Sequence, residues 1–213
     1  MVSTFHQPPP IDLSQGRSFS KRQEALLVDL EEIFLREGFR ALTIQQLVGR
    51  LHCSRSTLYD LAPSKDELVL LVLDRLLQRI GRQAIARAHQ HDDPLLRVHS
   101  YMSTASVALS SGSQAFSVDV AAHPGASRLF QQHYRFATSV CARLIQDGID
   151  QGVFRDMDAR LAAEVLYAGL DRITDPDVLR LTEHTGSEAI QQVFDLFVFG
   201  LSKGDGRRRS AGR

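Results

Sequence analysis

The chain has 213 residues, 43% of them hydrophobic, with 25 Lys and Arg against 25 Asp and Glu. This length and composition suit one or two globular domains, and the zero net charge gives no indication of a nucleic-acid partner. The spacing of the two cysteines, Cys53 and Cys141, fits neither a zinc site nor a disulfide framework, so we expect a reduced, cytoplasmic protein. We expect neither a membrane span nor a signal peptide, because no apolar run has the required length or flanks.

The first 18 residues contain Pro8-Pro9-Pro10 and lack hydrophobic periodicity, so residues 1–18 are predicted to be a disordered arm. Ser20 has the side chain of a helix N-cap, and the apolar spacing after it predicts a helix to about Glu37. Gly38 suits the position just beyond a helix end. Three basic residues lie near this junction, namely Arg17, Lys21 and Arg22. They either contact DNA, along its backbone or in the minor groove, or belong to a solvated tail.

Two short helices joined by a tight turn are predicted next. Thr43 is a suitable N-cap, and apolar residues at helical spacing up to Leu51 form one buried face. His52 interrupts this pattern, and Ser54 is a second N-cap before a helix that begins at Arg55. Such a helix-turn-helix can place the first residues of its second helix on base edges in the major groove of DNA.

Five short groups of residues within about residues 19–80 share the spacing of a known family. They are Gly38-Phe39, Thr43-Ile44, Ser54, Ser56-Thr57-Leu58-Tyr59 and Ser64-Lys65-Asp66-Glu67-Leu68. At these positions the chain resembles the TetR-type transcriptional regulators. The resemblance implies an all-α protein with a three-helix helix-turn-helix DNA-binding domain over residues 19–80. It also implies a helical ligand-binding and dimerisation domain over residues 81–203, and the basic tail 204–213 is expected to be disordered.

Two positions depart from the family pattern. His52 stands where the family usually has Gly, in a turn that commonly needs positive φ, which His tolerates better than most residues. Ala62 replaces the usual Phe and removes an apolar contact between the second motif helix and the helix after it. Residues 17–80 carry ten Lys and Arg against nine Asp and Glu, a net charge of only +1. These features keep an alternative open, namely a helical interaction module that has lost DNA binding.

Polar residues of the motif are assigned to two kinds of DNA contact. Arg55 and Thr57 begin the second helix and are expected at base edges, because Arg presents paired donors to guanine. Phosphate contacts are expected from the other polar residues at the starts of the two helices, namely Thr43, Gln45, Ser54 and Ser56. The resemblance implies phosphate contacts for Tyr59 and Lys65 as well. A packing or capping role is the alternative for Ser56 and Tyr59.

From residue 64 onward the apolar spacing predicts helices and no convincing strand. The predicted helices cover about residues 64–88, 93–110, 114–122, 126–151, 158–173 and 187–202. Two His and two Asp within residues 89–93 are residue types of a metal site, but the Pro94 that follows favours an interhelical loop. An all-helical enzyme that uses this cluster, or His99 and His133, is a further alternative. Because no nucleophile, metal spacing or phosphate loop supports it, we expect no catalytic residue, no cofactor and no metal.

The family keeps its inducer pocket in the middle helices, here about residues 93–151. Aromatic rings and a Met with a few polar groups are typical of a pocket for an apolar or aromatic small molecule. The residues expected to line it are His99, Tyr101, Met102, Phe116, Phe130, His133, Tyr134 and Phe136. The same residues at helical spacing are also typical of a plain hydrophobic core, and this alternative stays open.

The last two long helices present more apolar surface than one subunit leaves in water, above all in the run VFDLFVFGL. In the family such a pair forms a four-helix bundle with its twin, so the resemblance implies a homodimer. The residues expected at that interface are Leu166, Leu170, Val193, Phe194, Phe197 and Leu201, and an intramolecular core is the alternative. A two-fold dimer reads a palindrome with two recognition helices. The sequence therefore predicts a regulator, a repressor released from a palindromic DNA operator by a small ligand.

Overall fold

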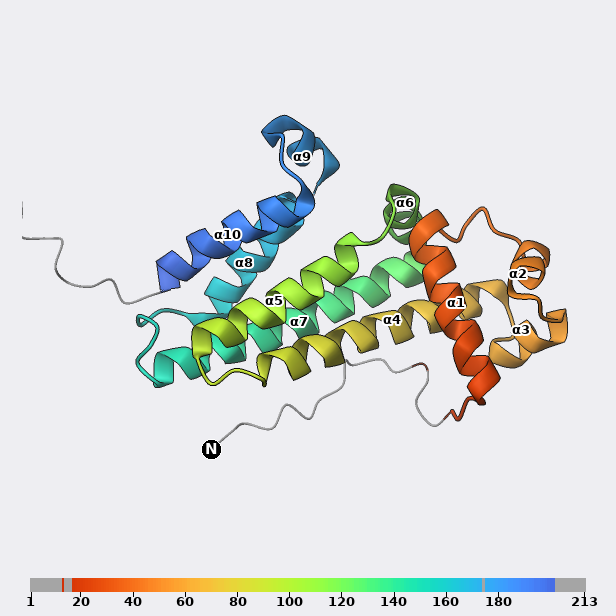
Figure 1. The fold of residues 1–213 in the computed structure, drawn as a ribbon, viewed down its shortest axis with the longest axis horizontal. Helices are drawn as coiled ribbons and strands as arrows, with labels where there is room; N and C mark the ends of the chain where they lie inside the picture. The colour runs from red at the N-terminus through yellow and green to blue at the C-terminus, as the bar shows by residue number, and fades with distance from the viewer. Residues whose placement is uncertain (1–12, 14–16, 174, 202–213) are drawn as a thin grey trace, which may run out of the picture. The chain divides into compact units, whose positions relative to one another are not determined.

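The computed structural model describes residue 13 and residues 17–173 and 175–201, which fold into helices without a strand. Most of the predicted arm over residues 1–18 and all of the predicted tail over residues 204–213 lie outside this described part. The helices are α1 (Lys21–Glu37), α2 (Ile44–Leu51), α3 (Arg55–Leu61), α4 (Lys65–Ala88), α5 (Pro94–Ser110), α6 (Gln114–Ala122), α7 (Pro124–Asp150), α8 (Ala159–Ile173), α9 (Pro176–Thr182) and α10 (Gly186–Leu201) (Figure 1). The predicted all-α class is confirmed.

The helices belong to two compact units. Unit 1 comprises the described residues up to 83 together with residues 108–137, and therefore holds α1 to α3, most of α4, α6 and the first half of α7. Unit 2 comprises residues 84–107 and the described residues from 138 onward, which include α8, α9 and α10. The sequence places a domain boundary at residue 80, and unit 1 also holds α6, which packs against α1, and the first half of α7.

Local capping fixes the start of each motif helix. Ser20 and Thr43 each form a capping box, with Gln23 and Gln46 respectively, and so bond two backbone N–H groups at the starts of α1 and α2. The side chain of Ser54 accepts a hydrogen bond from the backbone N–H of Thr57 at the start of α3. All three predicted N-caps are confirmed.

The turn between α2 and α3 accommodates His52 in place of glycine. His52 has φ 47° and ψ 44°, in the left-handed region, and its backbone N–H donates to the carbonyl of Val48. The expectation that His takes the positive φ of this turn is confirmed. Ala62 ends α3 in an extended conformation and is only 3% exposed, so the small side chain lies within the core.

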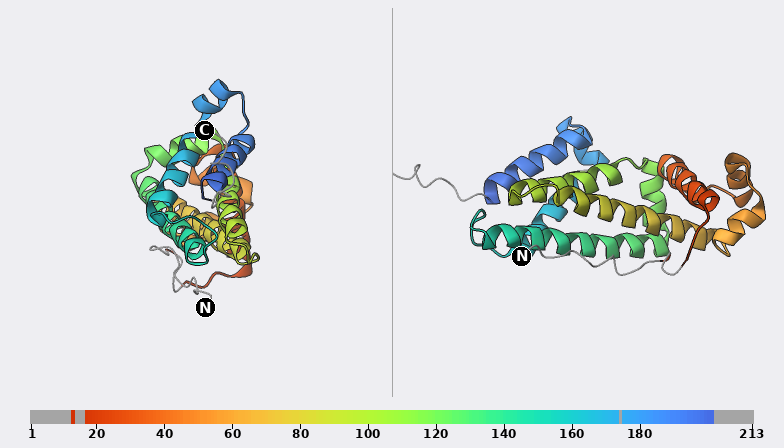
Figure 2. Two further views of the ribbon diagram at one scale, coloured as in Figure 1. Left: turned by 90° about the vertical axis from the view of Figure 1, so that its left-hand side faces the viewer. Right: turned by 60° about the horizontal axis from the view of Figure 1, so that its bottom comes forward.

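Unit 1 is held together by charged contacts across an apolar core. Helix α1 crosses α4 (Figures 1 and 2), and Arg75 on α4 pairs with Glu24 on α1. One helical turn further along α4, Arg79 donates to the Glu31 carboxylate at 2.6 Å, and this carboxylate belongs to a residue that is 5% exposed. Two ion pairs therefore join α1 to α4.

Unit 2 contains a helix that the apolar spacing does not predict. Helix α9 begins with Pro176 at its first position, and Asp175 caps it by accepting from the backbone N–H of Asp177. Helices α8 and α10 pack against each other, and the N–H of Arg155 donates to the carbonyl of Leu201 at 3.0 Å. None of the described helices has the length and apolar character needed to cross a membrane.

Candidate nucleic-acid interface

Helix α3 separates a buried apolar side from an exposed polar side. Leu58 and Leu61 are 1% and 0% exposed, whereas Tyr59 is 48% exposed. Ser54, Arg55 and Ser56 are exposed as well, and Thr57 is half-buried. The polar residues lie mostly at the start of this short helix. Its apolar residues pack into the core, so its polar side faces solvent and can contact a partner.

Hydroxyl groups gather at the beginning of α3. The Ser54 hydroxyl oxygen lies 2.7 Å from that of Ser56 and 2.8 Å from that of Thr57, and it also accepts the Thr57 backbone N–H at 3.1 Å. Ser54 is thus the N-cap, as expected, and the Ser56 hydroxyl bonds the capping side chain and not a backbone N–H group. Because each hydroxyl both donates and accepts, the same cluster can also donate to a phosphate oxygen.

The start of α2 presents a second polar group to solvent. Thr43 and Gln45 are both exposed, and the Thr43 hydroxyl oxygen accepts the Gln46 backbone N–H at 3.2 Å. The remaining N–H groups of this first turn have no partner within the helix, which is the usual condition of a helix N-terminus and favours an anion.

The two cations that the sequence assigns to DNA lie in different surroundings. Lys65 is half-buried, and its ammonium donates to the backbone carbonyl of Arg40 at 2.9 Å, so it fastens the loop before α2. An ammonium has three donors, and two remain for a phosphate. Arg55 is exposed, and no ion pair within the described part of the chain involves it.

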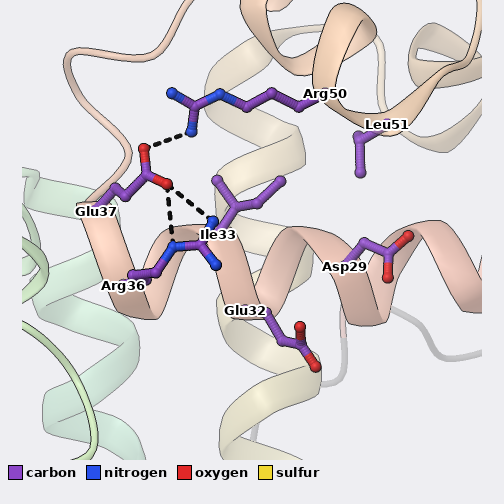
Figure 3. Close-up of a pocket in the computed structure, with 7 residues that line it drawn as sticks. All are labelled: Asp29, Glu32, Ile33, Arg36, Glu37, Arg50 and Leu51. Atoms are coloured by element: carbon purple, nitrogen blue, oxygen red, sulfur yellow. Dashed lines mark hydrogen bonds and ion pairs between the residues drawn. The ribbon is translucent and has the colours of Figure 1, made fainter.

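Two other arginines near the motif are already paired. Figure 3 shows Glu37 at the end of α1 between the guanidinium groups of Arg36 and Arg50, with which it forms hydrogen bonds and ion pairs. These hydrogen bonds lower the pKa of Glu37 below its ordinary value of 4.5, and the bond from Arg50 contributes more than the bond from Arg36. The cleft around these residues has five charged residues among its seven; the lining consists of Asp29, Glu32, Ile33, Arg36, Glu37, Arg50 and Leu51. It therefore does not have the apolar lining of a small-molecule pocket.

Arg17 makes a contact that sequence reasoning missed. Its guanidinium donates to the carbonyl of Leu61, at the C-terminal end of α3, at 2.5 Å. It also lies 5.0 Å from the centre of the Phe19 ring, and Arg75 lies 5.2 Å from the same ring. A cation that bonds the last carbonyls of a helix also complements the negative end of its dipole, so Arg17 supports the C-terminal end of α3.

The eight expected pocket residues do not all belong to one unit. His99, Tyr101 and Met102 lie in unit 2, and the other five lie in unit 1, namely Phe116, Phe130, His133, Tyr134 and Phe136. The rings of Phe116 and Phe130 are 6.1 Å apart, and Phe116 lies 6.4 Å from Phe39 in an edge-to-face contact. Phe116 thus belongs to the core beside the helix-turn-helix, which favours the core alternative for this residue.

Three groups expected at a pocket are buried or lie against other rings. Burial lowers the pKa of His133 to about 4 and raises the pKa of Tyr101 above its ordinary value. Among the described residues, the Nδ1 atom of His133 has no hydrogen-bond partner. The His99 ring lies 5.2 Å from the Phe194 ring within unit 2. A ligand group that bonds His133 Nδ1 would satisfy a polar atom that the chain leaves unpaired.

The residues expected at a dimer interface lie mostly inside unit 2. Leu166, Leu170, Phe194 and Leu201 are at most 5% exposed, and Val193 and Phe197 are half-buried. The first four are therefore part of the unit's own core. Exposed apolar side chains on the same helices are Leu161 (63%) and Val165 (59%) on α8 and Leu196 (74%) on α10. Helical spacing identifies the apolar residues of α8 and α10 but not the side that stays uncovered.

The polar connection around residues 89–93 does not assemble into a metal site: no three His, Cys, Asp or Glu of the described residues converge as ligands. The pKa of His89 lies below its ordinary value, mainly because the imidazole is partly buried and in addition because of the positive charge of Arg97. The two cysteines are free, and burial raises the pKa of Cys53 and raises that of Cys141 to about 12.

Comparison with known proteins gives a consistent result for the helix-turn-helix. Residues 26–72 match the family model described as bacterial regulatory proteins, tetR family. Comparison with curated protein sequences gives no significant match.

Several solved structures share the fold. A protein from Saccharomonospora viridis, described as a transcriptional regulator and solved with choline, is 21% identical, with a TM-score of 0.72 over 87% of this chain and 100% of that one. A TetR transcription regulator from Haloarcula marismortui is 20% identical, with a TM-score of 0.68 over 87% and 100%. The protein SmeT, solved with triclosan, is 16% identical, with a TM-score of 0.68 over 87% and 94%. At these identities the likenesses concern the fold.

Proposed function

We propose that this chain, whose residues 26–72 match the model of the tetR family of bacterial regulatory proteins, is a member of that family. We propose further that it is a sequence-specific DNA-binding repressor of transcription, without enzymatic activity, that a small ligand releases from its operator. The observation that carries this proposal is the arrangement of α3. Its apolar residues Leu58 and Leu61 are buried, while Arg55 and the hydroxyl cluster of Ser54 and Ser56 face solvent. A helix of this kind suits the major groove, whose base edges an Arg side chain reads.

Phosphates on either side of the groove are assigned to the remaining polar groups. The start of α2, with Thr43 and Gln45, offers N–H groups and a positive helix end to one phosphate. Tyr59 and the two remaining donors of Lys65 are assigned to others, and Thr57 completes the base-reading edge beside Arg55. Phosphate contacts fix the position of the protein on the duplex, and base contacts give its sequence preference.

Two copies of the chain are needed to recognise an operator longer than a few base pairs. One α3 of seven residues reaches few base pairs, whereas a two-fold dimer reads two half-sites and therefore a palindrome. We assign the dimer contact to the uncovered side of α8 and α10, where Leu161, Val165 and Leu196 are exposed. Burying each such side chain stabilises an association by about 1.5–3 kcal/mol.

The ligand is assigned to the middle helices, and its class follows from the side chains there. Aromatic residues supply apolar contact, and two buried polar atoms on α7, His133 Nδ1 and Gln132 Oε1, have no hydrogen-bond partner among the described residues. An apolar or aromatic molecule with a hydrogen-bonding group therefore fits best. The ligand acts by binding more tightly to a conformation that does not fit DNA, since only differential affinity shifts an equilibrium.

A gel-shift experiment tests the proposal. The full chain is titrated onto the DNA upstream of its own gene at low salt, with an unrelated duplex of equal length as the control. We expect a specific shift that triclosan, used as an aromatic probe, weakens and that choline, used as a cationic probe, leaves unchanged. Equal binding to both duplexes, or none to either, would contradict the DNA-binding role and favour a helical interaction module.

A further inference from the structure

We propose that Asp119, on α6, is a positioning residue for DNA binding, because its carboxylate holds the backbone of the loop that sets the start of α2. One oxygen, Oδ2, accepts the backbone N–H of Phe39 at 2.6 Å and that of Arg40 at 2.8 Å. These residues lie 80 and 79 positions earlier in the chain, in the loop between α1 and α2. Hydrogen bonds to a carboxylate are about twice as strong as those between neutral groups.

The close approach of α6 to the C-terminal end of α1 depends on Gly38. This residue has φ +77° and ψ −173°, a conformation that is essentially restricted to glycine. A Cβ atom at this position would overlap the Asp119 carboxylate and would lie 3.2 Å from the backbone of Ala115 on α6. A backbone hydrogen bond also joins α1 to the residue that caps α6, from the N–H of Ser113 to the carbonyl of Leu35 at 2.8 Å. The α1–α6 contact is therefore built around glycine at one end of α1, where Figure 1 shows α6 beside it.

The same loop is held from its other side by α4. The ammonium of Lys65 donates to the carbonyl of Arg40, so the two sides of this one residue's backbone are bonded to α6 and to α4. Phe39 is buried and packs its ring against those of Phe34, Phe116 and His123. Only three residues after Arg40, Thr43 caps α2. The short distance along the chain means that a shift of Arg40 moves the start of α2.

This role rests on the proposed function and refines it at one residue. The start of α2 is assigned to a phosphate, and a phosphate contact requires correct placement of the backbone N–H groups. Asp119 lies on a helix outside the helix-turn-helix and acts through the loop at residues 38–43. A purely structural carboxylate would instead contribute to the stability of the fold alone, without a specific effect on DNA affinity.

The test compares three variants of the full chain: Asp119→Ala, Asp119→Asn and, as a matched neighbour on α6, Val118→Ala. Val118 is 55% exposed, so its truncation leaves the contact with the loop intact. Two readouts are used: hydrogen exchange of the Phe39 and Arg40 amides by NMR, and affinity for a duplex that the wild-type protein has selected from a random pool. Exchange of buried α4 amides reports global stability.

For Asp119→Ala we expect exchange at both loop amides to accelerate at least tenfold and DNA affinity to fall about tenfold, with α4 exchange changed far less. Asp119→Asn keeps one carbonyl oxygen that can accept both N–H groups, so it should recover part of each loss. Val118→Ala should match the wild type in both readouts.

Three results would overturn the positioning role. The first is unchanged exchange at Phe39 and Arg40 in Asp119→Ala. The second is faster exchange at these amides with unchanged DNA affinity, and the third is an affinity loss that only follows a general acceleration of exchange in α4. A wild-type protein that selects no duplex would overturn the proposed function itself, and this failure is recognised before any variant is compared.

Discussion

Arg55 is an exposed cation at the start of α3, and its substitution tests the proposed base reading at a single residue. Arg55→Ala should cost about 1–3 kcal/mol of binding free energy and relax the preference at one operator position, because a bidentate contact with guanine is lost. Fluorescence anisotropy with the selected duplex and its single-base variants measures both effects.

Arg36 provides the matched control for this experiment. It carries the same charge on an exposed side chain, but it is bonded to Glu37 at the end of α1. Arg36→Ala should change affinity equally for all duplexes and leave the base preference as it is. If Arg55→Ala behaved in the same way, Arg55 would be a general charge and not a base-reading residue.

His133 makes the stability of the protein depend on pH. The folded protein keeps this imidazole neutral down to its lowered pKa of about 4, whereas the unfolded chain takes up a proton near the ordinary value of 6.5. Protons therefore favour the unfolded state as the pH falls from 6.5 to 4, and stability should fall by about 2 kcal/mol between pH 7 and pH 5.

Urea unfolding at pH 7 and pH 5 measures this loss. His133→Gln removes the titrating group, so this variant should lose about 2 kcal/mol less than the wild type between the two pH values. His91→Gln, in the connection between α4 and α5, is the control and should lose as much as the wild type. An equal loss in His133→Gln would show that other groups cause the pH dependence.

At the scale of elements, short-range sequence signals predicted most of the helices. Ser20, Thr43 and Ser54 cap their own helices within three residues, so local chemistry alone decides where α1, α2 and α3 begin. His52 at positive φ is likewise a local property of its turn. Helix α9 was not predicted, because its seven residues are too few to show an apolar period. Asp175-Pro176 is nevertheless a typical helix start.

Contacts that join distant parts of the chain were not predictable from the same signals. Asp119 bonds backbone groups about 80 residues earlier, and nothing in the sequence around either partner indicates the pairing. The same holds for Arg17, whose partner is a carbonyl at the end of α3. The periodicity of α8 and α10 identified apolar residues, but those chosen for a dimer face, such as Leu166 and Phe194, are buried in the chain's own core.

Substitutions of exposed apolar side chains on α8 and α10 test the proposed dimer contact. Leu161→Glu and Leu196→Glu should each weaken self-association at least about tenfold, because each would place a charge in the proposed dimer contact, where a leucine would otherwise be buried. Sedimentation equilibrium measures the change. Val118→Glu, at a similarly exposed position on α6, is the control and should leave the association unchanged. Dimers as stable as wild type in both leucine variants would exclude this side of α8 and α10 from the interface.

At the scale of the whole molecule, total charge says little about the partner. The chain has zero formal net charge, and Glu37 pairs with two of the arginines near the motif. What remains is a small polar surface formed by α3, the start of α2 and Lys65. Because few cations contact phosphates, we expect a modest dependence of DNA affinity on salt and a correspondingly larger share of the binding free energy from base contacts.

The most direct measurement is the selection of duplexes by the wild-type protein from a pool of random sequence at low salt, followed by sequencing. We predict an enriched motif with two inverted half-sites whose centres lie about one helical turn of DNA apart or a multiple of it. In the proposed dimer, two copies of α3 related by a two-fold axis enter successive major grooves. Enrichment of a single, unrepeated half-site would contradict the dimer, and no enrichment at all would contradict the reading of DNA by α3.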